Sequence, residues 1–320
     1  MQKFARILTV LAFTHAVTIA AAAEPYPSKP VKLIVPFAAG GGTDALARIV
    51  AQRLTDKWGQ SLVVDNRPGA EGVIGSQVVA QSPPDGYTLL WAVPSHALNP
   101  AMRLNMPYDT LKAFAPIAMV AATPYVIVAG KKLDAKTMPE LIAQAKTNPG
   151  RIGYGTNDAA GRIIGQLLKT GASIDIVDVP YKGSGPMLTD IVGGHVEIGF
   201  ISLPSAMSYY KAGTLKLLGV TSAKRTRLAP DLPTMMESGV KDFDVMLWWG
   251  IMGPAGTPAE IQSKIHRDLV ELAADREFRE SLSKAGAEPV ITSPQDFSKF
   301  FREEVANASA MVKAAGIKPE

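Results

Sequence analysis

The chain has 320 residues, of which 47% are hydrophobic and 19% are charged, and it contains no cysteine. This length allows two domains with a sizeable core, and the composition excludes a disordered chain and a multi-span membrane protein. Without cysteine there can be no thiol catalysis, thiolate metal site, disulfide or lipid-modified N-terminal cysteine. The formal net charge of +4, which falls to +2 without Lys3 and Arg6, gives no support to nucleic-acid binding, because no basic run accompanies it.

The chain begins with a segment typical of export. Residues 1–23 combine a short basic start, an apolar run from Ile7 and the sequence Ala21-Ala22-Ala23. This pattern predicts a secretory signal peptide cleaved before Glu24. The alternative is a membrane anchor, for which the apolar run is short. We therefore expect an exported protein, which in a Gram-negative cell lies in the periplasm.

Apolar runs rich in β-branched residues alternate with amphipathic helical stretches along the rest of the chain. The predicted strands are residues 31–35, 62–64, 88–93, 125–129, 174–179, 197–201 and 215–220. Helices are predicted after the capping sequences that begin at Thr137, Thr257 and Ser293, the last with Phe297, Phe300 and Phe301 on one face. Alternation of this kind predicts an α/β fold with mostly parallel sheets.

The first predicted strand runs into a glycine-rich loop. Residues 36–44 read Pro-Phe-Ala-Ala-Gly-Gly-Gly-Thr-Asp, and an amphipathic helix follows. Glycines here let the backbone approach a ligand closely, and the free N–H groups of a helix N-terminus favour an anion. Thr43 or Asp44 is expected to cap the helix. The loop lacks the lysine of a phosphate loop, and a tight turn without a ligand is the alternative.

A second loop of the same kind follows the strand at residues 62–64. Its glycines are Gly69, Gly72 and Gly75, a spacing that does not match the dinucleotide-binding fingerprint. Ligand sites in open α/β sheets lie at the carboxyl ends of strands. The two loops are therefore predicted to form one rim that receives an anion.

These segments resemble the Bug proteins, the TctC-like periplasmic solute-binding components of tripartite tricarboxylate transporters. The resemblance covers nearly the whole chain after residue 23. It is carried by the sequences at residues 26–30, 36–44, 66–70, 83–87, 107–111, 180–186, 193–196, 220–225 and 253–258.

The resemblance implies a two-lobed type II periplasmic binding protein fold, in which each lobe is a mostly parallel sheet flanked by helices. Residues 24–124 and 245–320 would form lobe one, and residues 125–244 lobe two, with crossings near residues 125–129 and 247–252. A small organic carboxylate would bind between the lobes and pass to a membrane transporter of the tripartite tricarboxylate type. The protein is expected to be a monomer without a cofactor.

The resemblance also implies which residues hold the ligand. In lobe one, the loops would bind one carboxylate through backbone N–H groups and bridging waters, with a further polar position at Ser95 and His96. Asp44 is interpreted as a cap and water acceptor, because a bare carboxylate would repel the ligand. The positions implied in lobe one are Phe37, Ala39, Gly42, Thr43, Asp44, Ala70, Gly72, Ser95 and His96.

Lobe two departs from the family pattern. The loop at residues 156–162 is shorter than usual, and Arg162 stands near a customary histidine. Arg162 could clamp a second carboxylate, or it could pair with Asp158 or lie in solvent. Ser202 stands where an acidic or amide residue is common, and Thr156 and Ser205 are further expected contacts.

Other classes of protein fit the sequence less well. An exported hydrolase would need a nucleophile motif such as GxSxG, which is missing. None of the four histidines forms an HExxH or i, i+4 pair, so a catalytic metal site is not expected. A partner of a sensor protein would use the same pocket and remains an alternative. Trp248 and Trp249 lie at a predicted crossing, where they could pack or stack on a ligand.

Overall fold

Strands and helices alternate along the chain, as expected. The computed structural model describes residues 26–241 and 243–320, so the predicted signal peptide lies outside the described residues. The strands are β1 (Val31–Val35), β2 (Leu62–Asn66), β3 (Thr88–Ala92), β4 (Phe114–Gly130), β5 (Ile152–Thr156), β6 (Ile176–Pro180), β7 (Ile198–Ser202), β8 (Leu215–Val220), β9 (Met246–Pro254) and β10 (Glu288–Pro289). The helices are α1 (Gly42–Trp58), η1 (Ala70–Gly72), α2 (Val73–Ala80), α3 (Pro94–Met102), α4 (Met138–Thr147), α5 (Ala159–Ala172), α6 (Ser184–Gly193), α7 (Leu203–Lys211), α8 (Ala259–Ala274), α9 (Arg276–Lys284) and α10 (Pro294–Ala314).

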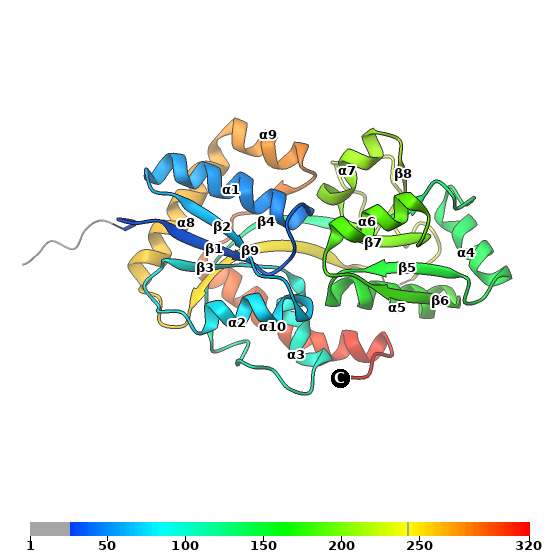
Figure 1. Cartoon of the computed structure of the whole chain (residues 1–320), viewed down its shortest axis with the longest axis horizontal. Coiled ribbons are helices and arrows are strands. Elements are labelled where there is room, and N and C mark those ends of the chain that lie inside the picture. Colours follow the sequence, from blue (N-terminus) through cyan, green and yellow to red (C-terminus); the bar gives the residue numbers. More distant parts are fainter. Residues whose placement is uncertain (1–25, 242) are drawn as a thin grey trace, which may run out of the picture.

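The strands form two sheets that share β4. One sheet has the order β2-β1-β3-β9-β4 and the other β4-β7-β5-β6, with β10 and β8 also pairing with β4. Figure 1 shows α1, α2, α3, α8, α9 and α10 around the first sheet and α4 to α7 around the second. We call these two bodies lobe one and lobe two. The α/β prediction is confirmed.

Parallel pairing is confined to the outer strands of each sheet. β2-β1-β3 and β6-β5-β7 are parallel, whereas β9 and β4 pair antiparallel with their neighbours. The physical reason is that β4 leaves lobe one and β9 returns to it, so the two run in opposite directions. The expectation of mostly parallel sheets therefore holds for the outer strands and is replaced by a mixed sheet at the crossing.

β4 changes partners at one point along its length. It pairs with β9 as far as Pro124, which faces Met246, and with β7 from Tyr125, which faces Ser202. We propose that the lobes divide here, at the boundaries expected from the sequence. A single continuous strand therefore serves both lobes.

Thr221 joins the segments that cross between the lobes. Its hydroxyl donates to the carbonyl of Val245 at 2.6 Å and accepts from the N–H of Tyr125 at 2.9 Å. Its own backbone N–H donates to the Tyr125 carbonyl, and its carbonyl accepts from Val245. Since Thr221 is fully buried, these bonds satisfy polar groups that water cannot reach.

The predicted helix caps are confirmed in two cases and wrong in one. Thr137 and Ser293 accept from the N–H groups of Glu140 and Asp296. Thr257 instead donates to the carbonyl of Pro254 at 2.7 Å in a tight turn, and α8 begins only at Ala259. The hydroxyl that was expected to cap the helix is therefore used by the preceding turn.

The predicted face of α10 is confirmed. Phe297 and Phe301 are buried beside Trp248 in the core of lobe one, with Phe300 packed at its edge. In the part of the chain that the structure describes, no helix combines the length and the apolar character needed to cross a membrane.

Thr221→Val is expected to destabilise the protein by about 1–3 kcal/mol, because it leaves the buried N–H of Tyr125 without its acceptor. Urea unfolding of the variant would measure this loss. Thr170→Val is the matched control, since the Thr170 hydroxyl bonds to its own helix at an exposed site. Equal stability of the two variants would contradict a joining role for Thr221.

Candidate functional site

The first glycine loop is organised by Asp44. One carboxylate oxygen accepts from Gly40 N–H and Arg48 Nε, both at 3.0 Å, and the other accepts from Asn66 Nδ2 at 3.0 Å. Burial alone would raise the pKa of Asp44, but these hydrogen bonds outweigh it and lower the pKa. Since Asn66 ends β2, Asp44 ties the first loop to the strand that precedes the second.

The expected cap of α1 is wrong in detail. The N-cap position is Gly41, and Asp44 lies within the first turn and reaches back to Gly40. A carboxylate in the first turn also favours the helix dipole.

The second glycine loop has a left-handed backbone. Ala70 and Glu71 have φ values of 46° and 53°, and Gly72 follows at 96°. Such angles cost a residue with a side chain of order 1–3 kcal/mol, and they often mark functional sites. Gly72 packs against the ring of Phe37, so the two loops are in contact. Ala39 and Ala70 are exposed on these loops.

The start of α1 meets lobe two directly. Gly42 N–H donates to Ser205 Oγ at 2.9 Å, and this oxygen lies 2.8 Å from Ser202 Oγ. A Cβ added to Gly42 would lie 2.6 Å from both serine oxygens, which is too close for real atoms. The structure thus brings together three predicted site residues from opposite lobes, and glycine at position 42 permits the contact.

Arg162 lies in an ion-pair network between the lobes. Its guanidinium is 3.3 Å from Glu71 and 2.9 Å from Glu320, both in lobe one, and 3.7 Å from Asp178 in lobe two. Glu71 also pairs with Arg103 at 3.2 Å. Arg162 was expected either to clamp a second carboxylate or to lie beside Asp158 or in solvent, but here its charge is shared among three carboxylates of the chain itself.

Thr156 supports the lobe-two side of this network. Its hydroxyl donates to Asp178 at 2.7 Å, and Asp178 is also an Arg162 partner. Thr156 is buried, at the end of β5.

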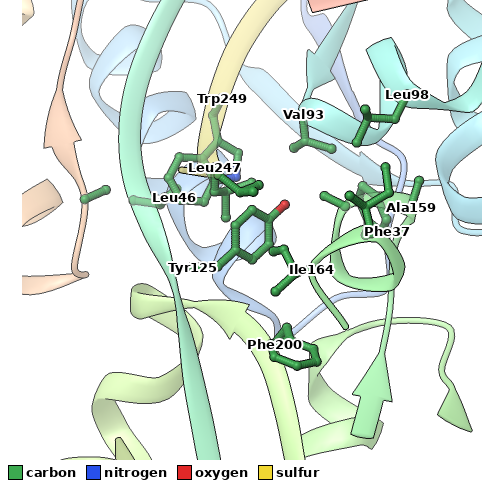
Figure 2. Close-up of a cluster of buried hydrophobic side chains, with 14 of the residues drawn as sticks. Phe37, Leu46, Val93, Leu98, Tyr125, Ala159, Ile164, Phe200, Leu247 and Trp249 are labelled. Carbon is green, nitrogen blue, oxygen red and sulfur yellow. The ribbon is translucent and has the colours of Figure 1, made fainter. Parts of the chain in front are cut away.

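A continuous apolar cluster joins the lobes beside these polar groups. Figure 2 shows Tyr125 between Trp249 and Ile164, with its hydroxyl directed away from Phe200. The cluster contains side chains from both lobes. Lobe one contributes Phe37, Leu46, Val93, Leu98 and Trp249, and lobe two contributes Ala159, Ile163, Ile164 and Phe200.

The two tryptophans of β9 have different surroundings. Trp249 Nε1 donates to Thr43 Oγ1 at 3.2 Å. Because Trp249 belongs to the interlobe cluster, this bond places the predicted site residue Thr43 beside that cluster. Trp248 packs against Phe297 and Phe301 in lobe one. Trp248 therefore packs in the core, one of the two alternatives stated above.

His96 and Ser95 are neighbours in α3 with different environments. His96 stacks on Tyr108 and Phe301, and its Nδ1 lies 3.1 Å from Ser76 Oγ. Burial lowers the pKa of His96 to about 3, so its ring is neutral. All these contacts lie within lobe one, whereas Ser95 shares a helical stripe with Leu98 of the interlobe cluster.

Several residues at the lobe interface did not appear among the predicted ligand contacts. Glu71, Asn99, Tyr125 and Asp158 lie where α3 and its neighbour η1 meet α5 and where β4 crosses between the lobes. Asp158 could have been found from the sequence, because it directly precedes a helical stretch and accepts from Gly161 N–H as an N-cap. The others become apparent only when the lobes are brought together.

Asp158 is a buried carboxyl group. The pKa of Asp158 is raised to about 6, mainly by burial and also by the nearby charge of Glu71, against the lowering effect of backbone N–H groups and of the nearby Tyr125 hydroxyl. Ionisation of Asp158 in this environment therefore lowers the stability of the folded protein.

The fold and the site define a two-lobed solute-binding protein. A model of the tripartite tricarboxylate transporter family receptor (TctC) matches residues 46–317. The chain belongs to this family of periplasmic solute-binding proteins.

Individual relatives agree with this assignment. Protein BugT of Bordetella pertussis is 34% identical over 99% of both chains. A Rhodopseudomonas palustris protein solved with adipate is 35% identical, with a TM-score of 0.89 over 92% of this chain and 100% of that one. MatC of the same organism, solved with malate, is 26% identical, with a TM-score of 0.84 over 90% of this chain and 100% of that one. The periplasmic binding protein BugD is 33% identical, with a TM-score of 0.87 over 92% of this chain and 100% of that one.

Gly42→Ala is expected to leave each lobe folded but prevent full closure, because the added methyl group meets Ser202 and Ser205 across the interface. The chain has no cysteine, so one cysteine at Gln52 and one at Lys211 would carry spin labels that report the distance between α1 and α7. The variant should lose the short-distance population. Gly185→Ala, a helical glycine with open space around it, is the control, and an unchanged distribution for Gly42→Ala would contradict the role assigned to Gly42.

Asp158→Asn is expected to stabilise the protein at pH 8 by up to about 3 kcal/mol, the value of a pKa raised from 3.8 to about 6. Asparagine preserves the helix cap but cannot ionise. The wild-type penalty is complete above pH 6 and disappears as the pH falls from 6 toward 4, so the two proteins should converge in that range.

Thermal unfolding between pH 4 and pH 8 would test this dependence on pH. Asp275→Asn, the same change at the exposed cap of α9, should show no gain at pH 8. A less stable Asp158→Asn variant at pH 8 would contradict the expectation.

Proposed function

We propose that this protein is exported to the periplasm, binds a small organic carboxylate between its lobes and delivers it to a membrane transporter of the tripartite tricarboxylate type. The observation that carries the proposal is the meeting of the glycine-loop helix start with Ser202 and Ser205 of lobe two. Closed lobes at this point would enclose a ligand held by the backbone N–H groups of lobe one.

The charge and hydrogen-bond pattern of lobe one suits an anion. The N-terminus of α1 presents N–H groups and the positive end of the helix dipole, and the carboxylate of Asp44 is already occupied by Gly40, Arg48 and Asn66. Asp44 therefore organises the loop, and its charge is offset by Arg48. Two structural relatives solved with adipate and malate support a carboxylate.

The interface also explains how a ligand would change the conformation. A ligand shifts the equilibrium toward the closed form only by the difference between its affinities for the closed and open forms. Contacts made by one ligand with both lobes provide this difference. Phe37, Gly42 and Thr43 from lobe one, and Thr156, Ser202 and Ser205 from lobe two, are the proposed contributors.

A thermal-shift screen of unfolded and refolded protein, freed of carried ligand, is expected to find a stabilising carboxylate among aromatic and aliphatic mono- and dicarboxylates. Ligand at about 100 times Kd should add roughly 2.7 kcal/mol. Gly42→Ala should reduce the shift and Gly185→Ala should not. Folded protein that responds to no carboxylate would refute the proposed ligand class.

Delivery needs its own experiment. The wild-type protein should support uptake of the identified carboxylate when combined with the membrane subunits of its transporter in vesicles. Co-purification with a sensor protein, without any stimulation of uptake, would favour the signalling alternative.

A further inference from the structure

Three buried polar atoms at the lobe interface are available for a ligand. Ser95 Oγ and Asn99 Oδ1 make no hydrogen bond with any residue in 26–241 or 243–320, and the Tyr125 hydroxyl has only the nearby Asp158 carboxyl, which it does not reach with hydrogen-bond geometry. Each side chain belongs to a residue only 1% exposed. Buried polar groups are normally paired, so these three atoms call for a partner from outside the chain, either water or a ligand.

The three residues lie where the lobes meet, because α3 of lobe one packs against α5 of lobe two and β4 crosses between them. Ser95 and Asn99 are four residues apart on α3, on the stripe that includes Leu98. Tyr125 stands in the interlobe cluster (Figure 2). Asp158 begins α5 on the opposite side and is close enough for its charge to act on the Tyr125 hydroxyl.

Two of these groups can only accept hydrogen bonds, whereas the Ser95 and Tyr125 hydroxyls can donate or accept. The Asn99 amide donates through Nδ2 to the Glu71 carbonyl at 3.2 Å, so its oxygen is the unpaired atom. Asp158 uses Oδ1 to accept from Gly161 at 2.7 Å, and an ionised carboxylate can only accept. A ligand that matches the oxygens of Asn99 and Asp158 must bring hydrogen-bond donors.

The charges at the interface disfavour a second ligand carboxylate. Arg162 is paired with Glu71 and Glu320, and Arg103 is paired with Glu71 through a terminal nitrogen, although its buried Nε has no partner among the described residues. The carboxylates of Glu71, Asp178 and Glu320 lie beside these arginines, and Asp158 is nearby, so negative groups outnumber positive ones. Another anion here would meet like charges in a poorly solvated space.

We propose that the ligand is a small monocarboxylate whose far end carries a hydrogen-bond donor, such as a hydroxyl, an amide or an ammonium group. The donor is received by Asp158 and Asn99, with Tyr125 and Ser95 completing the contacts. The inference rests on the proposed function, because the single carboxylate is the group that lobe one would hold. It assigns Arg162 to the contact between the lobes, in place of the second-carboxylate clamp expected from the sequence.

Matched ligands test this inference. Every carboxylate scaffold that binds in the screen would be compared by calorimetry at pH 7.5 as its diacid, its monoamide and its plain acid; for the six-carbon scaffold these are adipate, adipamate and hexanoate. The monoamide should bind about tenfold more tightly than either of the others, since a hydrogen bond to a charged group is worth at least this factor.

The outcomes separate the two proposals. A diacid that binds more tightly than its monoamide, or a plain acid that binds equally well, would overturn the inference and leave the proposed function intact. If no carboxylate of any scaffold bound the folded protein, the proposed function itself would fail.

Variants connect the preference to the named side chains. Asp158→Asn keeps the helix cap but removes the charge, and it should reduce the affinity ratio of monoamide to diacid about tenfold. Tyr125→Phe, which removes only the hydroxyl, provides a second test if Asp158→Asn folds poorly. Asp275→Asn should keep the wild-type ratio, and an unchanged ratio in both interface variants would refute the assignment.

Discussion

The contact between Gly42 and Ser205 limits how closely the lobes approach. The N–H of Gly42 bonds to the serine hydroxyl, and the space that a Cβ would need is filled by the oxygens of Ser202 and Ser205. The other interlobe contacts, including the apolar cluster around Tyr125 and the Arg162 ion pairs, exist only when this approach is made. The absence of a Cβ atom at Gly42 therefore allows the whole interface to form.

The interface combines groups with opposite effects on stability. Apolar side chains such as Phe37, Leu98 and Ile164 favour closure because they leave water together. Asp158 opposes closure when ionised, since its charge is buried there. Ion pairs such as Arg162 with Glu71 give orientation more than affinity, because desolvation offsets much of their attraction. A balance of this kind leaves the closing equilibrium sensitive to a ligand.

Local sequence patterns predicted most of the strands but missed others, including β9 and the first part of β4. The strands at residues 31–35 and 215–220 have the predicted limits, because their apolar runs are bounded by turn residues. The Thr257 cap failed because a competing turn took its hydroxyl. β9 runs antiparallel because the chain crosses between the lobes twice. Hydrophobic periodicity can predict a strand, but it does not predict the direction in which the strand pairs.

The candidate site was less predictable than the fold. The glycine loops are local in sequence, so their place at the strand ends followed from the pattern. The partners of Arg162 did not, since Glu71 and Glu320 are far from it along the chain. Tyr125 lies on a strand that is mostly apolar in sequence, and Asn99 is one of several polar residues on α3, so only the arrangement of the lobes shows that both lie at the interface.

The sharing of β4 also restricts the order in which the chain can fold. Lobe two is built from one uninterrupted segment, so its strands can pair as soon as that segment is complete. Lobe one needs β9, which follows lobe two in the chain and pairs with both β3 and β4. Pairing between such distant segments is slow because a long loop must close first. The lobe that carries both glycine loops is therefore the last to be completed, after the lobe that closes over them.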